Sequence, residues 1–177
     1  MYQITIVNDI RGNAYNELIE YLIRKCDSFL FHLPNMGKLL INERNAEFFP
    51  EYSMGYTEET DQEKHKIYIK KVEPLLDIIS NDITERWKDT GYLDQTSNIE
   101  MEIFQILISE QTCMLFANAE SILSWKYPDL PEDPCFMCDE VCIFQCIAHE
   151  GLCYFNSTDP WIFGFLKKYN IDFFMSN

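Results

Sequence analysis

Residues 135–148 read CFMCDEVCIFQCIA, a pattern that predicts a β-hairpin. Apolar residues lie on both sides of the polar pair Asp139 and Glu140, which supplies the turn chemistry between two short strands. A third short strand is expected at 152–155. The chain also opens with an alternating run rich in β-branched residues, 2–7, that predicts another strand. These segments indicate a β-sheet as the centre of the fold.

Apolar residues at helical spacing surround the expected strands. The stripe from Tyr15 to Leu33 predicts a long helix, with Asn13 as its N-cap and Pro34 at its end. Three further helices are expected where a proline or a capping residue precedes an apolar stripe: 74–87, 110–125 and 160–169. Two further strands are expected at 66–72 and 99–108, and a helix running on from residue 99 is the competing interpretation of the second.

The mixture of helices and strands predicts an α+β fold, with α/β as the alternative. We expect a single globular domain, 1–177, made of one mixed or antiparallel β-sheet with about four helices packed on it. An irregular acidic segment is expected near residues 35–63, where glycine, proline and acidic residues interrupt the periodic patterns.

The charge of the chain is the strongest indication of its partners. Fourteen Lys and Arg stand against 29 Asp and Glu, a net charge of −15, while apolar residues make up 47% and aromatic residues 15% of the chain. This composition is too apolar for a disordered acidic chain and predicts a packed core. A surface this acidic repels nucleic acid and anionic membranes, so we expect neither as a partner.

The cellular location is inferred from features that the sequence lacks. No apolar run approaches the roughly 20 residues that cross a bilayer. The first residues lack the basic and apolar regions of a signal peptide. The seven cysteines are an odd number, which favours reduced thiols over a disulfide framework. We therefore expect a cytoplasmic protein, and no motif in the sequence indicates a cofactor.

One dense cluster of cysteines with a histidine offers two chemical alternatives. A zinc ion would be held by Cys135, Cys138, Cys146 and His149, because Cys-x-x-Cys and Cys-x-x-His pairs each supply two ligands. A catalytic thiol would be formed by Cys146 with His149 and Glu150. Free cysteines on apolar strands are commonly buried core residues, and we favour that interpretation over both alternatives.

In its size, mixed fold and large negative charge, the chain resembles the small acidic immunity proteins that neutralise bacterial toxins. The resemblance implies a non-enzymatic protein that binds a basic toxin domain, often a nuclease, and blocks its active site. The first hypothesis is therefore a protein-binding module whose acidic side chains steer a basic partner. The residues expected to contact that partner lie in two acidic runs: Glu58, Glu59, Asp61, Glu63, Asp129, Glu132 and Asp133.

Two other functions remain as alternatives to the binding module. The first is a zinc-binding or cysteine-dependent protein centred on Cys135–Cys153. The second is a structural protein that forms homo-oligomers through an apolar surface of its Phe-rich C-terminal residues: Phe163, Phe165, Phe173 and Phe174.

Overall fold

A computed structural model describes residues 3–34, 67, 70–92 and 98–176. Within these ranges, eight strands form one sheet in the order β3-β4-β2-β5-β6-β7-β1-β8, and every neighbouring pair is antiparallel. The sequence predicts one mixed or antiparallel sheet, and the structure shows the antiparallel form. The strands are β1 (Gln3–Ile6), β2 (Ser28–Pro34), β3 (Ile83–Tyr92), β4 (Asn98–Leu107), β5 (Glu132–Cys138), β6 (Val141–Ile147), β7 (Leu152–Phe155) and β8 (Phe173–Ser176).

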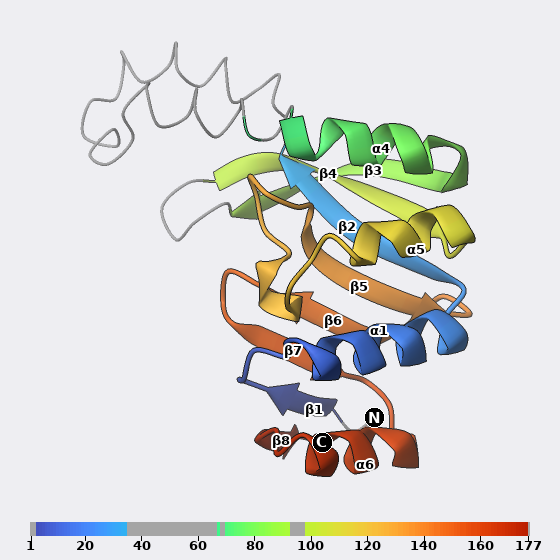
Figure 1. Cartoon of the computed structure of the whole chain (residues 1–177). Helices are drawn as coiled ribbons and strands as arrows, with labels where there is room; N and C mark the ends of the chain where they lie inside the picture. The colour runs from blue at the N-terminus through green and yellow to red at the C-terminus, as the bar shows by residue number, and fades with distance from the viewer. Residues whose placement is uncertain (1–2, 35–66, 68–69, 93–97, 177) are drawn as a thin grey trace, which may run out of the picture.

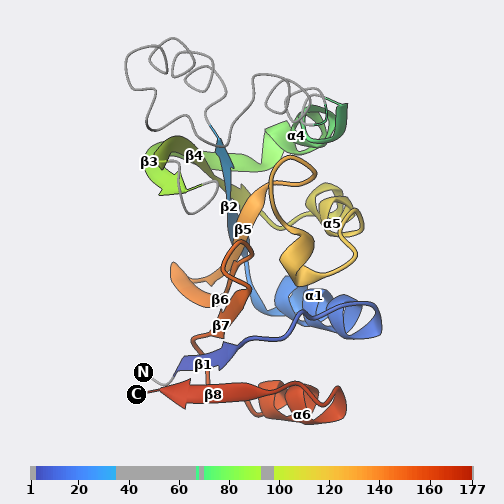
Figure 2. The same cartoon turned by 90° about the vertical axis from the view of Figure 1, so that its left-hand side faces the viewer.

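The described residues form four α-helices that lie on the same face of the sheet, in front of it in Figure 1 and to its right in Figure 2. They are α1 (Asn13–Lys25), α4 (Glu73–Ile79), α5 (Glu110–Phe116) and α6 (Pro160–Lys168), with short 3₁₀ turns at Ser80–Asp82 and Ile122–Ser124. The arrangement is α+β, but the sheet dominates it, and α4 and α5 are shorter than the sequence predicts. No helix of the described residues is long and apolar enough to cross a membrane.

The predicted hairpin is confirmed as β5 and β6. Asp139 and Glu140 have φ angles of 48° and 65°, so both central residues of the turn adopt the left-handed conformation. Two-residue turns of this kind match the right-handed twist of antiparallel strands, which explains why polar residues occupy both positions. Strand β5 begins at Glu132, earlier than the expected start at Cys135, so the end of the acidic connector belongs to the sheet.

The prediction of one long helix from Tyr15 to Leu33 is wrong in its second half. Helix α1 ends at Lys25, and β2 follows it almost at once. Phe29 and Leu33 are four residues apart and fit a helical stripe, but together with Phe31 they also fit the two-residue period of a strand. Pairing with β4 on one side and β5 on the other decides between the two periods.

Two other predictions, for residues that follow the first acidic segment, are also wrong. Ile67, Lys70 and Lys71 have helical backbone, where the sequence predicts a strand over 66–72. The helix expected over 74–87 ends at Ile79, and Ile83 begins β3. Ile83 continues the apolar stripe of the helix, but it belongs to β3, which pairs with β4 along most of its length.

The remaining expectations concern the second half of the chain. Strand β4 confirms the strand interpretation of 99–108 and rules out a helix running on from residue 99. Helix α5 begins after Ser109 as predicted, but it ends at Phe116 rather than near Trp125. Strand β8 pairs with β1 at the edge of the sheet, an element that the sequence analysis missed.

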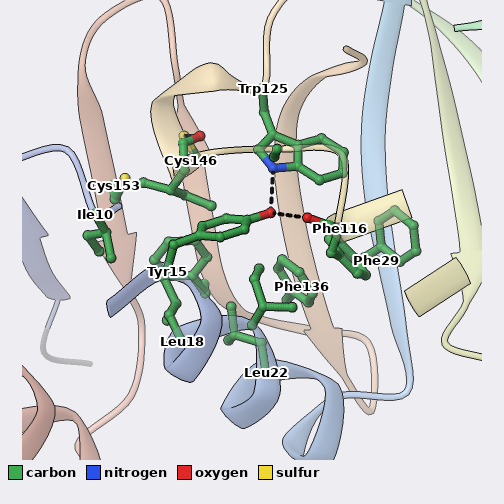
Figure 3. Close-up of a cluster of buried hydrophobic side chains, with 14 of the residues drawn as sticks. Ile10, Tyr15, Leu18, Leu22, Phe29, Phe116, Trp125, Phe136, Cys146 and Cys153 are labelled. Atoms are coloured by element: carbon green, nitrogen blue, oxygen red, sulfur yellow. Dashed lines mark hydrogen bonds between the residues drawn. The ribbon is translucent and has the colours of Figure 1, made fainter. Parts of the chain in front are cut away.

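The core lies between the helices and the covered face of the sheet. Figure 3 shows Tyr15 of α1 reaching toward Trp125, beside the phenyl rings of the strands. The Tyr15 hydroxyl donates to the carbonyl oxygen of Phe116 at 2.9 Å and accepts from the indole Nε1 of Trp125 at 3.1 Å. These two bonds satisfy the polar atoms that the aromatic side chains carry into the core.

Candidate functional site

The acidic residues predicted to contact a partner differ in their exposure, and some lie outside the described residues. Glu58, Glu59, Asp61 and Glu63 lie outside the described residues, as does the whole of 35–63. The Asp129 side chain is 56% exposed and forms an ion pair with Lys71. Glu132 is only 4% exposed, so the expectation of an exposed connector does not hold at this position.

A second group of carboxylates, here called the acidic turn, consists of Asp27, Asp139 and Glu140. All three are exposed, Asp27 between α1 and β2 and the other two in the β5–β6 turn. The backbone N–H of Asp139 donates to Asp27 Oδ2 at 3.0 Å. That bond and one from the Ser28 hydroxyl lower the pKa of Asp27, which keeps its carboxylate charged. Within the described part of the chain, none of the three forms an ion pair.

A different arrangement, the carboxylate–histidine cluster, joins Glu132, Asp133 and His149. One ligand atom from each residue lies within 4.8 Å of the others. His149 Nδ1 is 3.4 Å from Asp133 Oδ2, and the two side chains are 27% and 15% exposed. The cluster therefore has a buried floor at Glu132 and opens to solvent beside His149.

The polypeptide brings these side chains together through an irregularity in β5. His32 of β2 is opposite Glu132 and Leu30 is opposite Cys135, so two residues of β5 face one residue of β2. Asp133, one of these two, has a φ of 51°, in the left-handed region that Asp tolerates better than most residues. Successive residues of a regular strand point to opposite faces, and the bulge lets Glu132 and Asp133 converge instead.

Hydrogen bonds from the backbone hold both carboxylates in place. The N–H of Ala148 donates to Asp133 Oδ1 at 2.7 Å, and the N–H of Tyr127 donates to Glu132 Oε1 at 3.1 Å. Burial, followed by the negative charge of Asp133, raises the pKa of Glu132 to about 8. Burial also raises the pKa of Asp133. The carboxyl groups of Glu132 and Asp133 therefore hold their protons to a higher pH than exposed carboxyl groups do.

The zinc site predicted from Cys135, Cys138, Cys146 and His149 is not assembled. The Cys135 thiol contacts the Cys142 thiol at 3.0 Å, and His149 belongs to the carboxylate–histidine cluster, which contains no cysteine. The Cys146 thiol lies in the core (Figure 3). It donates to the Ile122 carbonyl at 3.4 Å. The favoured interpretation of this thiol as a core residue agrees with its complete burial.

The same burial bears on the alternative of a catalytic thiol. A hydrogen bond with Cys153 and burial both raise the pKa of Cys146. A nucleophilic cysteine needs the opposite, a lowered pKa and access to substrate. His149 contacts Asp133 rather than the Cys146 thiol, and Glu150, the residue after His149, is exposed. The structure does not unite Cys146, His149 and Glu150 as a catalytic group.

The aromatic residues proposed for a homo-oligomer surface divide between the core and the surface. Phe165 is buried and Phe163 is partly buried, whereas Phe173 and Phe174 lie on β8 at the edge of the sheet. The Phe174 side chain is the more exposed of the two, at 64%. Self-association through this edge stays a prediction.

Sequence reasoning missed two contributors to these sites. The helix predicted from Tyr15 to Leu33 includes His32, and only the pairing of β2 places it opposite Glu132. The same predicted helix includes Asp27, although the alternation of Phe29, Phe31 and Leu33 indicates a strand that begins just after it.

Comparison with known proteins gives no relative to guide these assignments. No family model, no curated protein and no solved structure matches the chain. The functional conclusions below therefore depend on the chemistry of the chain itself.

Proposed function

We propose that this protein is a non-enzymatic binding protein for a basic protein domain, acting as an immunity-type inhibitor of a basic toxin domain. The observation that carries the proposal is the net charge of −15, which the ion pairs of the described residues leave uncompensated at the acidic turn. Exposed carboxylates without cationic neighbours generate the field that attracts a basic partner.

The acidic turn is a better contact site than the connector that the sequence analysis favoured. Asp129 of the connector already has Lys71 as a partner, and Glu132 is buried. Asp139 and Glu140 project from a tight turn between two paired strands, and a rigid turn loses little conformational entropy when it is bound. The acidic turn therefore replaces the connector as the proposed contact on the described residues.

Charge steering affects the rate of association more than the lifetime of the complex. Complementary charges raise association rate constants to about 10⁸–10⁹ M⁻¹s⁻¹ at low salt, against about 10⁵–10⁶ M⁻¹s⁻¹ without them. An inhibitor of a toxin benefits directly, because it must reach the toxin before the toxin reaches its target.

The test uses purified basic nuclease domains of bacterial toxins as partners in a surface-binding assay at low salt. We expect at least one domain to bind, and the double variant Asp139→Asn with Glu140→Gln to associate several-fold more slowly. Asn tolerates positive φ, so the turn is retained. The matched control is Glu110→Gln with Glu120→Gln, which removes two exposed charges elsewhere on the molecule.

Two outcomes would refute different parts of the proposal. If no basic domain binds, the proposed function is wrong. If the control pair slows association as much as the turn pair, the acidic turn is not the contact site and only the overall charge matters.

A further inference from the structure

We propose that Glu132, Asp133 and His149, beside the imidazole of His32, bind a divalent transition-metal cation of the zinc class. This site goes beyond the proposed binding function and does not depend on it. Three observations lead to it: the spacing of the ligand atoms, the way the carboxylates are held, and a buried imidazole nitrogen without a partner.

The spacing of the three ligand atoms is close to what a metal requires. They lie within 4.8 Å of one another, and His149 Nδ1 is 3.4 Å from Asp133 Oδ2. Ligands at about 2.1 Å from a tetrahedral zinc ion are about 3.4 Å apart. The His149–Asp133 pair already has this separation, and the partly exposed His149 side chain is free to adjust the others.

The carboxylates are oriented as metal ligands commonly are. Asp133 accepts the Ala148 N–H through Oδ1, and Glu132 accepts the Tyr127 N–H through Oε1. Each residue therefore keeps a second oxygen that no described backbone group occupies. Hydrogen bonds of this type fix the direction of a ligating carboxylate before the metal arrives, which increases affinity.

The electrostatic environment of the two carboxylates favours a cation. Glu132 is 4% exposed and Asp133 is adjacent to it, and burying two neighbouring carboxylates is costly unless a positive charge accompanies them. The basic side chains near them are those of Lys126, which lowers the pKa of Glu132, and of His149 and His32, which lower the pKa of Asp133. Among the described residues, no lysine or arginine forms an ion pair with either carboxylate, and a divalent ion would supply that positive charge.

His32 supplies the independent observation. Its Nδ1 is buried and has no hydrogen-bond partner among the described residues. Residues directly opposite each other on antiparallel strands have side chains on the same face, and His32 is directly opposite Glu132. His32 lies outside the group of ligand atoms that are within 4.8 Å of one another, so its imidazole stands beside a set of one imidazole nitrogen and two carboxylate oxygens. That borderline ligand set suits zinc and similar ions.

The seven cysteines make the choice of probe important, because thiols also bind zinc. Cobalt(II) distinguishes the two kinds of site: thiolate ligands add an intense near-ultraviolet charge-transfer band, and nitrogen and oxygen ligands do not. The full chain, freed of metal with a chelator, is titrated with Co²⁺ and then with Zn²⁺ as a competitor. We expect one equivalent of Co²⁺ to bind with visible bands, without the thiolate band, and to be displaced by Zn²⁺.

Single variants assign the ligands. His149→Gln and Asp133→Asn should each weaken Co²⁺ binding by at least about tenfold. Glu150→Gln is the matched control because Glu150 is the exposed acid next to His149 and lies outside the cluster, and it should leave affinity unchanged. His149 is partly exposed, so its variant should fold, which thermal unfolding of the metal-free protein will verify.

The inference is overturned by any of three results. The wild-type chain does not bind Co²⁺ or Zn²⁺ at millimolar concentration, the bound Co²⁺ shows the thiolate band, or the folded His149→Gln variant binds as tightly as wild type. A thiolate band would show that the cysteines bind the metal, and unchanged binding by the variant would show that another group binds it.

Discussion

Tyr15 connects helix α1 to the segment that follows α5. Its hydroxyl donates to the Phe116 carbonyl and accepts from Trp125, and all three residues are almost completely buried (Figure 3). Because water has no access to these atoms, each depends on the others for its hydrogen bonds. Burial also raises the pKa of Tyr15, so the hydroxyl stays protonated.

Replacement of Tyr15 by Phe should lower the free energy of unfolding by about 1–3 kcal/mol, the cost of leaving buried polar groups unpaired. Urea denaturation measures the change. The control is Tyr169→Phe, whose hydroxyl contacts Glu17 near the surface and whose loss should cost less because solvent can replace it. Equal losses in the two variants would show that the buried network is not special.

Glu132 gives the pH dependence of stability a definite sign. Its pKa is about 8 in the folded protein and near 4.5 in the unfolded chain, so between these values the folded state holds more protons. Stability from this group is therefore fully present below pH 4.5 and is lost as pH rises through 8. Asp133 shifts in the same direction, so the comparison must isolate Glu132.

We expect the Glu132→Gln variant, measured with a chelator present, to gain stability relative to wild type as pH rises from 5 to 9. The amide keeps an oxygen for the Tyr127 N–H and has no charge to bury. Urea denaturation of both proteins at several pH values gives the difference, which should change by a few kcal/mol. Parallel profiles would mean that Glu132 does not carry this proton.

Among the elements, α5 shows that residues within one turn are sufficient to determine where a helix begins. Ser109 Oγ accepts from the N–H groups of Gln111 and Thr112, while Thr112 Oγ1 accepts from the Ser109 N–H. This reciprocal cap satisfies backbone donors that the first turn cannot pair. Helix α6 begins in a related way, with the Asp159 side chain accepting from the N–H of Trp161.

Loss of the cap should be measurable in the whole protein. Ser109→Ala should lower the free energy of unfolding by about 1 kcal/mol. Ser80→Ala is the control, since the exposed Ser80 hydroxyl donates to the Asp77 carbonyl near its own helix end and should matter less. An indistinguishable effect of the two substitutions in urea denaturation would contradict the importance of the cap.

Elements that depend on distant pairing could not be predicted in this way. The helix starts after Ser109 and at Pro160 follow from residues within one turn, and both predictions are confirmed. Strand β2 depends on β4 and β5, which lie about 70 and 100 residues further along the chain. The spacing of Phe29 and Leu33 is compatible with both structures, so the sequence alone selected the wrong one.

At the scale of the molecule, the candidate sites were only partly accessible to sequence reasoning. The sequence predicts Glu132 and Asp133 as partner contacts, and His149 as a zinc ligand or as the partner of a catalytic thiol. Their association depends on the bulge in β5 and on the position of residue 149 just beyond β6, and neither leaves a signature in composition or spacing. The net charge, in contrast, needs no structure, and it remains the basis of the proposed function.

The central claim is that acidic charge brings this protein to a basic partner. The most direct measurement is the association rate constant with a basic toxin domain as a function of salt, from low ionic strength to about 0.5 M, where screening acts within about 4 Å. We predict a fall of at least about tenfold, with a much smaller change in the dissociation rate constant. An association rate constant that does not change with salt would contradict the claim.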